Sequence, residues 1–358
     1  MSNIPENIKD ESLLIPNESQ ESVDGTNPEL PTTEEPAHAT SPIPVLPQLS
    51  VALGVLVFVF GVTYIGAAKT LSKNPNTNEM RIETTLSDTS KNLAIATNFF
   101  DAVTLEAKSA FVWDVQTQRV LFNKNADDIH PLASVTKLMT ALVAYELLDP
   151  TDKVKISQRS LRTEGDSGFV DGEEFSMRNL VDLTLISSSN DGAVALSEKI
   201  GATVVRSQDP EKVFVEAMNL RATELGLTNT RFLNSSGLDI SKSEAGAYGT
   251  ARDIALLMEY IITKSADVTE LTTTDITTIS NNSGEYHIVK NTNDVVNGID
   301  GLIASKTGYT VLAGGNLVVA FDAGFNRPIV IAILGSSQNG RFNDILKLVN
   351  SARQTINN

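Results

Sequence analysis

The stretch His130-Pro-Leu-Ala-Ser-Val-Thr-Lys-Leu-Met-Thr-Ala-Leu-Val-Ala-Tyr145 decides how the rest of the chain is interpreted. Within it, Ser134 and Lys137 form a Ser-x-x-Lys pair at the start of a run whose apolar residues recur at helical spacing. Two side chains three residues apart on a helix share a face, so the amine of Lys137 can reach the hydroxyl of Ser134. The stretch therefore predicts a core helix that begins with a serine beside a lysine.

This pairing matters chemically because a serine hydroxyl is a poor nucleophile until a base removes its proton. A lysine serves as that base when burial or a neighbouring cation keeps its amine neutral. The free N–H groups in the first turn of a helix also suit a developing oxyanion. Taken alone, however, the pair favours a plainer interpretation, a solvated serine and lysine that flank a core helix, because short motifs occur by chance.

Two further motifs stand downstream. The first lies in Ser187-Ser-Ser-Asn-Asp191, a polar cluster between two apolar runs that predicts a loop between helices or a helix edge facing a cleft. Within this cluster, only Ser188 gives a Ser-x-Asn pattern with Asn190. The second motif, Lys306-Thr-Gly308, falls in a predicted strand, where it can present an ammonium, a hydroxyl and an open backbone edge to an extended peptide-like ligand. A Thr-Gly pair in a strand can also simply mark a bulge.

Strand patterns stand at both ends of the region that carries these motifs, and helical patterns lie between them. The predicted strands are 109–115, 119–122, 302–311, 316–321 and 328–334. The region 150–270 is mostly helical in pattern, and the predicted helices include 214–225, 250–262 with Thr250 as a cap, and a closing helix at 342–352. We therefore expect an α+β fold, in which an antiparallel sheet flanked by helices meets an all-helical lobe at a cleft.

Composition excludes several classes of protein and site. The chain has 358 residues and a formal net charge of −16, which argues against a nucleic-acid partner because phosphate binding needs clustered Lys and Arg. No cysteine is present, so disulfides, thiolate catalysis and cysteine-ligated metals are excluded. The three histidines, His38, His130 and His287, are widely spaced and show no zinc-binding pattern. We expect no metal and no cofactor.

The three motifs occur in the order, and on the kinds of element, that are typical of penicillin-binding proteins and class A β-lactamases. Additional stretches narrow the resemblance: Leu225-Gly-Leu-Thr-Asn-Thr-Arg-Phe232, Gly237-Leu-Asp239 and Thr250-Ala-Arg-Asp253. On these residues, the region 96–358 resembles the serine D-alanyl-D-alanine carboxypeptidases, which are low-molecular-mass penicillin-binding proteins with a β-lactamase/transpeptidase-like fold. One departure is Ser189, where the family more often has Ala or Gly.

The resemblance implies acyl transfer on the D-Ala-D-Ala peptides of peptidoglycan, and on β-lactams. Ser134 would be the nucleophile and Lys137 the general base. The oxyanion would lie between the backbone N–H groups of Ser134 and Tyr309. Ser188 would relay a proton to the departing D-alanine nitrogen.

The resemblance also implies how the substrate is held. Asn190 would hold both the catalytic lysine and a substrate amide. Lys306 would stay charged, would help keep the catalytic lysine neutral, and with Thr307 and Thr310 would anchor the terminal carboxylate. The implied substrate-binding residues are Asn190, Lys306, Thr307, Gly308, Tyr309 and Thr310.

Three alternative functions stay open at this point. A β-lactamase shares the scaffold but needs an added general base for deacylation. Glu164, Glu173 and Glu174 lie between the first two motifs, where such a carboxylate belongs, although none has a matching context. A non-catalytic peptidoglycan-binding homologue is opposed by the intact motifs, and D,D-endopeptidase activity on cross-links would use the same site.

Other polar residues near the motifs receive structural interpretations. His130 precedes Ser134 by four residues and raises the alternative of a Ser–His triad, but its neighbours supply no orienting acid in a recognised order. We interpret His130 as a turn or cleft-rim residue. Asp191 and Arg252 are interpreted as structural.

The N-terminal quarter of the chain is organised differently. Residues 1–48 carry nine acidic residues against one lysine and eight of the 13 prolines, a composition typical of a disordered tail. Residues 49–68 are 20 uncharged residues, which at about 1.5 Å per residue span the ~30 Å hydrocarbon core of a bilayer. Because a long acidic tail precedes them, we predict an uncleaved transmembrane signal anchor, with a cleaved signal peptide as the alternative. Residues 69–95 are then a linker to the catalytic domain at 96–358.

The orientation of this anchor is ambiguous. Lys69 and Lys73 follow the span, and the positive-inside rule would place the C-terminal part in the cytoplasm. Peptidoglycan chemistry requires the opposite orientation, and large domains translocate largely regardless of flanking charge. We therefore expect a single-pass cell-membrane protein whose catalytic domain is extracytoplasmic.

Overall fold

The computed structural model describes residues 98–204 and 209–357. Its central sheet contains β1 (Ser109–Asp114), β2 (Arg119–Lys124), β10 (Leu302–Thr310), β11 (Gly314–Asp322) and β12 (Pro328–Ser336). The strands are antiparallel and lie in the order β10-β11-β12-β1-β2. Strands from the two ends of the region therefore join where β12 pairs with β1, which confirms the predicted sheet.

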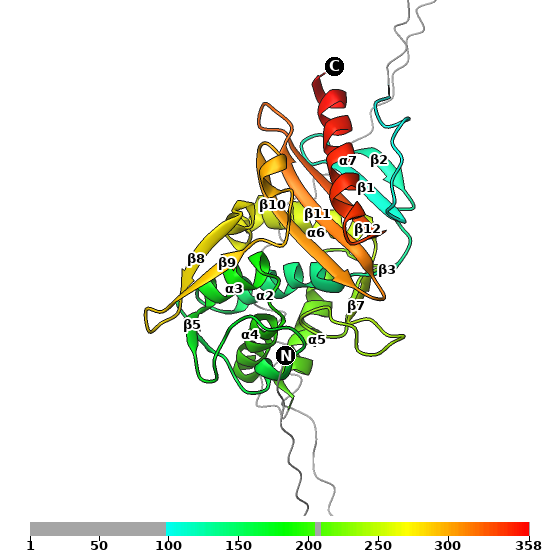
Figure 1. Ribbon diagram of the computed structural model, residues 1–358. Helices are drawn as coiled ribbons and strands as arrows, with labels where there is room; N and C mark the ends of the chain where they lie inside the picture. Colours follow the sequence, from blue (N-terminus) through cyan, green and yellow to red (C-terminus); the bar gives the residue numbers. More distant parts are fainter. Residues whose placement is uncertain (1–97, 205–208, 358) are drawn as a thin grey trace, which may run out of the picture. The chain divides into compact units, whose positions relative to one another are not determined.

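Both faces of this sheet are covered by helices (Figure 1). Leu317 and Phe321 of β11 pack in one core with α7 (Gly340–Asn357), whereas Val318 packs on the opposite face in a core that includes α6 (Ala251–Lys264). Because successive side chains of a strand point to opposite faces, a strand covered on both sides is apolar throughout. This two-sided burial explains the unbroken apolar runs of β11 and β12.

The remaining elements form the helical lobe and its connections, and the lobe shares its core with the α6 face of the sheet. The α-helices are α2 (Lys137–Leu147), α3 (Met177–Ile186), α4 (Asn190–Val204) and α5 (Pro210–Glu224). The short strands are β3 (His130–Pro131), β4 (Lys153–Lys155), β5 (Glu174–Ser176), β6 (Arg231–Phe232), β7 (Ala247–Gly249), β8 (Ile276–Ser280) and β9 (Tyr286–Lys290). The 3₁₀ helices are η1 (Ala133–Thr136), η2 (Ser160–Arg162), η3 (Ala266–Val268), η4 (Glu270–Thr273) and η5 (Val296–Gly298).

The predicted helix ends are partly confirmed. The Thr250 side chain accepts a hydrogen bond from the backbone N–H of Asp253 at 3.0 Å, so the predicted cap of α6 is confirmed. The helix predicted from Phe214 begins earlier, at Pro210, because proline is well tolerated in a first helical turn. Ser134 does not begin the α-helix as predicted but lies in the preceding 3₁₀ turn, η1.

The predicted acidic tail, membrane anchor and linker, at 1–48, 49–68 and 69–95, lie outside the described residues. Within 98–204 and 209–357, no helix has the length and apolar character that a membrane span requires. The three N-terminal assignments stay predictions.

Candidate active site

Ser134 and Lys137 meet where η1 runs into α2. Their spacing places both side chains on one side of the turn, and Lys137 Nζ donates to Ser134 Oγ at 2.8 Å. Lys137 Nζ also donates to Asn190 Oδ1 at 2.7 Å and to the backbone carbonyl of Ser236 at 2.8 Å. Since Lys137 is fully buried, these three acceptors match the three N–H donors of its ammonium form.

The surroundings of Lys137 disfavour its charged form. Burial lowers the pKa of Lys137 well below its ordinary value, and the cation of Lys306 lowers it further, whereas Asp191 acts in the opposite direction. The amine of Lys137 therefore gives up its proton far more readily than an exposed lysine does.

A neutral Lys137 can keep all of its contacts. Carbonyl oxygens only accept hydrogen bonds, so Asn190 Oδ1 and the Ser236 carbonyl retain the two N–H groups of the neutral amine. The third contact, at 2.8 Å, then sets the nitrogen lone pair against the hydroxyl of Ser134. This geometry suits transfer of the hydroxyl proton to the lysine.

Two glycines let neighbouring backbone segments approach Ser134 closely. A Cβ on Gly308 in β10 would lie 2.9 Å from the carbonyl oxygen of Leu132 and 3.1 Å from the backbone nitrogen of Ser134. A Cβ on Gly237, which has a φ of +81°, would lie 1.9 Å from the carbonyl oxygen of Ala133. Glycine is therefore needed at both contacts, because any side chain would push the segments apart.

Ser188 and Asn190 come from the junction between α3 and α4. Ser188 has a φ of 62°, a left-handed conformation that reverses the chain between the two helices. Its hydroxyl accepts a hydrogen bond from Lys306 Nζ at 2.9 Å. Asn190 is the first residue of α4, and its Nδ2 donates to the backbone carbonyl of Glu164 at 2.7 Å. The predicted loop between helices is confirmed, and it brings each of these residues to a lysine from another motif.

Lys306 is buried on β10 between Ser188 and the guanidinium of Arg341. Its Nζ also donates to the backbone carbonyl of Thr307 at 2.9 Å. Burial lowers the pKa of Lys306 to about 7, with a smaller contribution from the positive charge of Arg341. The sequence did not predict this lowered pKa, because it showed neither the burial of Lys306 nor the second cation.

The other residues of the strand segment have different partners. The hydroxyls of Thr307 and Thr292 form a hydrogen bond at 2.5 Å. Tyr309 is 46% exposed. The Thr310 hydroxyl donates to Asp239 Oδ1 at 2.9 Å, so in this structure it ties β10 to the loop that carries Asp239. The expected contact of Thr310 with a substrate carboxylate stays a prediction.

Sequence reasoning missed Arg341 and Ser236. Arg341 lies in the first turn of α7, is buried, and donates from Nη1 to the backbone carbonyl of Gly308 at 2.8 Å. Its Nε is buried and has no hydrogen-bond partner among the described residues. No motif surrounds Arg341, and Ser236 contributes a backbone carbonyl, which any residue type could supply.

The serines that flank Ser188 have local partners. Ser187 Oγ donates to the backbone carbonyl of Leu183 at 2.8 Å. Ser189 Oγ shares a hydrogen bond with Ser167 Oγ at 2.6 Å, and the backbone N–H of Ser167 donates to Asp191 at 3.3 Å. The departure from the family pattern at position 189 therefore secures the loop that contains Ser167.

His130 and Arg252 also bond away from the nucleophile. His130 Nε2 and Ser109 Oγ are 2.8 Å apart, so the observed partner of the histidine is Ser109 and not Ser134. Arg252 donates to both carboxylate oxygens of Asp127, at 2.6 and 3.0 Å. These contacts agree with the structural interpretations of both residues.

Two of the three candidate glutamates have carboxylate partners away from Ser134, and the third is in contact with Asn190. Glu173 pairs with His287 at 2.6 Å, and Glu174 forms an ion pair with Lys153 at 3.7 Å. Glu164 contacts the site through its backbone carbonyl. In the part of the chain that the structure describes, no group of three His, Asp or Glu residues is arranged to hold a metal ion.

Sequence comparisons connect this geometry with known proteins. Residues 96–338 match the family model described as D-alanyl-D-alanine carboxypeptidase. The D-alanyl-D-alanine carboxypeptidase DacF of Bacillus subtilis is 33% identical over 253 residues, which cover 69% of this chain and 62% of that relative. A D-alanyl-D-alanine endopeptidase of Escherichia coli is 32% identical over 233 residues, or 63% of this chain and 70% of the relative. The chain thus spans less than two thirds of the length of DacF.

Solved structures show the same architecture. Penicillin-binding protein D2 of Listeria monocytogenes in its ampicillin-bound form superposes with a TM-score of 0.60 at 28% identity, over 70% of this chain and 98% of that one. A variant of the Streptomyces K15 DD-transpeptidase gives a TM-score of 0.61 at 26% identity, with the same coverage of both chains. The mixed helix and sheet architecture predicted from the sequence is therefore confirmed.

Proposed function

The chain belongs to the D-alanyl-D-alanine carboxypeptidase family, and on that premise we propose that it is a serine D,D-peptidase. Its substrate is the D-Ala-D-Ala terminus of peptidoglycan stem peptides, and its product is the peptide shortened by one D-alanine. The reaction proceeds through an acyl-enzyme on Ser134 and serves cell-wall maturation.

The observation that carries this proposal is the arrangement around Lys137. Its two carbonyl acceptors and its low pKa favour a neutral amine whose lone pair points at Ser134. A structural lysine needs no serine hydroxyl among its partners and no second cation nearby. The arrangement therefore supports general base catalysis.

The acylation step uses groups from three motifs. Lys137 takes the hydroxyl proton while Ser134 Oγ attacks the carbonyl of the penultimate D-alanine. The backbone N–H groups of Ser134 and Tyr309 stabilise the oxyanion. The C–N bond then breaks, and the proton reaches the departing amine through Ser188, whose hydroxyl contacts Lys306. Water subsequently hydrolyses the ester and releases Ser134.

The terminal carboxylate of the substrate binds beside Ser188, on the side where Lys306 contacts the serine hydroxyl. Lys306 and Arg341 provide two buried cations there, and Thr307 provides a hydroxyl. A bound carboxylate favours the charged form of Lys306 and so draws a proton back to it. This anchor accounts for recognition of a free D-alanine terminus.

Endopeptidase activity is the second candidate function. The E. coli relative that aligns with this chain is named a D-alanyl-D-alanine endopeptidase, and cleavage of a cross-link uses the same acyl-enzyme chemistry. In an endopeptidase substrate, the leaving group is a residue of a second stem peptide and not a single D-alanine. This larger leaving group needs more room next to the carboxylate anchor. Both activities share the nucleophile and the base.

We also propose that residues 49–68 tether the protein to the cell membrane and that the catalytic domain faces the peptidoglycan. The uncharged run supports the tether, and the location of the substrate supports the orientation. Protease added to intact spheroplasts should remove the domain and spare residues 1–48. Protection of the domain would show that Lys69 and Lys73 had set the opposite orientation.

The function is tested by incubating the protein with a fluorescent penicillin and timing the decay of the label. A long-lived adduct is expected, whereas rapid loss would indicate a β-lactamase and no label a non-catalytic homologue. The Ser134→Ala variant should fold normally and show no penicilloyl adduct by mass spectrometry. An adduct on that variant would mean that another residue is the nucleophile.

A further inference from the structure

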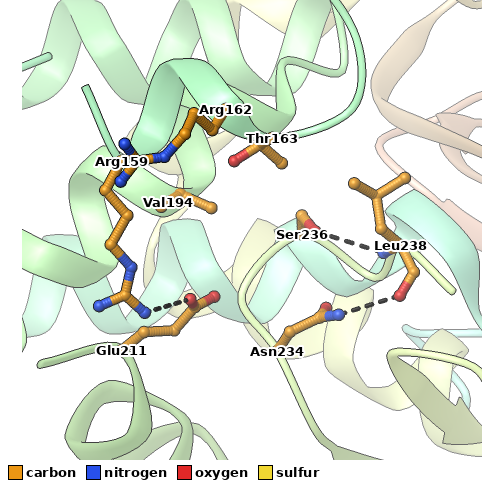
Figure 2. A pocket seen from close by; sticks show the side chains of 8 residues that line it. All are labelled: Arg159, Arg162, Thr163, Val194, Glu211, Asn234, Ser236 and Leu238. Carbon is orange, nitrogen blue, oxygen red and sulfur yellow. Dashed lines mark hydrogen bonds and ion pairs between the residues drawn. The ribbon is translucent and has the colours of Figure 1, made fainter. Parts of the chain in front are cut away.

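Figure 2 shows a cavity of the helical lobe, with a volume of about 310 Å³. It opens between η2, the start of α4, the start of α5 and the loop that follows β6. Its lining residues are Arg159, Arg162, Thr163, Val194, Glu211, Asn234, Ser236 and Leu238.

The walls of this cavity continue into the groups that hold the catalytic residues. Ser236 lines the cavity, and its backbone carbonyl accepts a hydrogen bond from Lys137. Thr163 directly precedes Glu164, whose carbonyl accepts a hydrogen bond from Asn190. The cavity therefore borders the side of the active site on which Asn190 lies.

The charged side chains of the cavity leave one positive charge uncompensated. Arg159 and Glu211 pair at 3.2 Å, as Figure 2 shows, and Arg159 also contacts Asp209 at 3.2 Å and Glu198 at 3.6 Å. Among the described residues, the exposed guanidinium of Arg162 has no ion pair and no side-chain hydrogen bond.

The uncharged polar side chains of the cavity also differ in whether they have hydrogen-bond partners. Both polar atoms of the Asn234 amide have a partner, because Nδ2 donates to the Leu238 carbonyl at 2.9 Å and Oδ1 accepts from the N–H of Gly237 at 2.7 Å. Within the described part of the chain, the hydroxyl of Thr163 has no hydrogen-bond partner. A guanidinium and a hydroxyl on adjacent residues are thus available to one ligand, and together they suit an anion.

We propose that this cavity is a subsite for the acyl part of the peptide substrate, in which Arg162 and Thr163 bind a carboxylate. The proposal rests on the proposed function, because it needs a peptide acylating Ser134. In this proposal Lys306 and Arg341 take the leaving D-alanine, and the acyl part lies beside Asn190. The side chain of Asn190 contacts Lys137 and the Glu164 carbonyl next to the cavity. With this subsite, the enzyme prefers stem peptides in which the residue preceding D-Ala-D-Ala carries a free side-chain carboxylate.

The test uses two synthetic peptides and the full-length protein. Both are Nα-acetyl-lysyl-D-Ala-D-Ala, and the lysine side chain carries either a succinyl group with a free carboxylate or the matching succinamyl amide. We expect kcat/KM to favour the carboxylate peptide by about five- to tenfold, mainly through KM, as for one partly exposed charge-assisted contact. The preference should shrink at high salt, because exposed charges are screened.

Variants assign the preference to the cavity. In Arg162→Gln the ratio should fall to about one, and Arg162→Lys should keep part of it because the charge remains. The matched control is Arg119→Gln, on β2 at the opposite edge of the sheet from β10, and it should keep the wild-type ratio. Thermal unfolding checks that each variant is folded.

The outcomes separate this inference from the proposed function. Hydrolysis of both peptides at equal kcat/KM by the wild type, or an unchanged preference in Arg162→Gln, would overturn the subsite and leave the D,D-peptidase intact. No hydrolysis of either peptide, together with no penicilloyl adduct, would overturn the proposed function and the subsite with it.

Discussion

Lys137 on α2 and Lys306 on β10 are both completely enclosed lysines, yet their surroundings differ. Lys137 is held by a side-chain carbonyl, a backbone carbonyl and the nucleophile. Lys306 is held by Ser188 and a backbone carbonyl, and it faces the guanidinium of Arg341. The pKa of each is lowered, chiefly by burial and then by a second cation.

The difference teaches how one residue type takes two roles within one site. Lys137 has a serine hydroxyl where its lone pair would point, so loss of its proton creates a base. Lys306 has a pKa of about 7 and, in the proposed mechanism, contacts the substrate carboxylate, so the arriving anion restores its charge. Burial lowers the pKa of both lysines. In the proposed mechanism, Lys137 therefore loses its proton before the reaction, and Lys306 regains its proton when the substrate binds.

Among the variants that test the two lysine roles, Lys137→Arg is expected to lose the most activity. A guanidinium keeps the positive charge but does not deprotonate in proteins, so the base is lost. The second-order rate of acylation by a penicillin should fall by about 100- to 10,000-fold, the usual contribution of general base catalysis. The exposed Lys155→Arg variant serves as the control. A loss of less than tenfold at Lys137 would show that another group takes the proton.

A smaller effect is expected for Lys306→Arg. This change keeps a cation beside Ser188 and the substrate carboxylate, so acylation should fall by only about tenfold, mainly through weaker binding. The measurement is kcat and KM on a D-Ala-D-Ala peptide, compared directly with the Lys137→Arg variant. Equal losses in the two arginine variants would break the division of roles between the lysines.

The smallest of these effects is expected for Arg341→Gln. KM for the peptide should rise about fivefold, because one of two cations at the carboxylate anchor is lost. Removing a positive neighbour also favours the charged form of Lys306, so its pKa should rise above about 7. The alkaline limb of the kcat/KM profile should therefore move to higher pH. Arg353→Gln on the same helix is the control, and an unmoved limb would contradict the proposed coupling.

The sequence predicted the strands and helices of the sheet and the helical lobe, because each depends on local patterns. Apolar runs revealed β11 and β12, and the spacing of Ser134 and Lys137 placed them on one turn. These features need no knowledge of which segments lie side by side. The order of motifs in the family then implied which of them share a site.

The rest depends on tertiary contacts that leave no local pattern. Ser236 and Glu164 act through backbone carbonyls, which any residue type provides. Arg341 reaches the site because α7 packs on the sheet, a contact between distant parts of the chain. The lowered pKa of Lys306 follows from its burial together with this arginine, and the expectation that Lys306 is charged when it binds a carboxylate stays a prediction.

The pH dependence of acylation tests most directly whether the neutral amine of Lys137 is the base. The base acts above its own pKa, which burial lowers well below the ordinary lysine value, and Lys306 acts below its pKa of about 7, so the wild-type rate should fall above neutrality. In Lys306→Arg the falling limb should vanish and leave a plateau, since a guanidinium stays charged. The account predicts that this plateau begins far below the ordinary lysine pKa of 10.5. A rate that keeps rising tenfold per pH unit up to that value would contradict it.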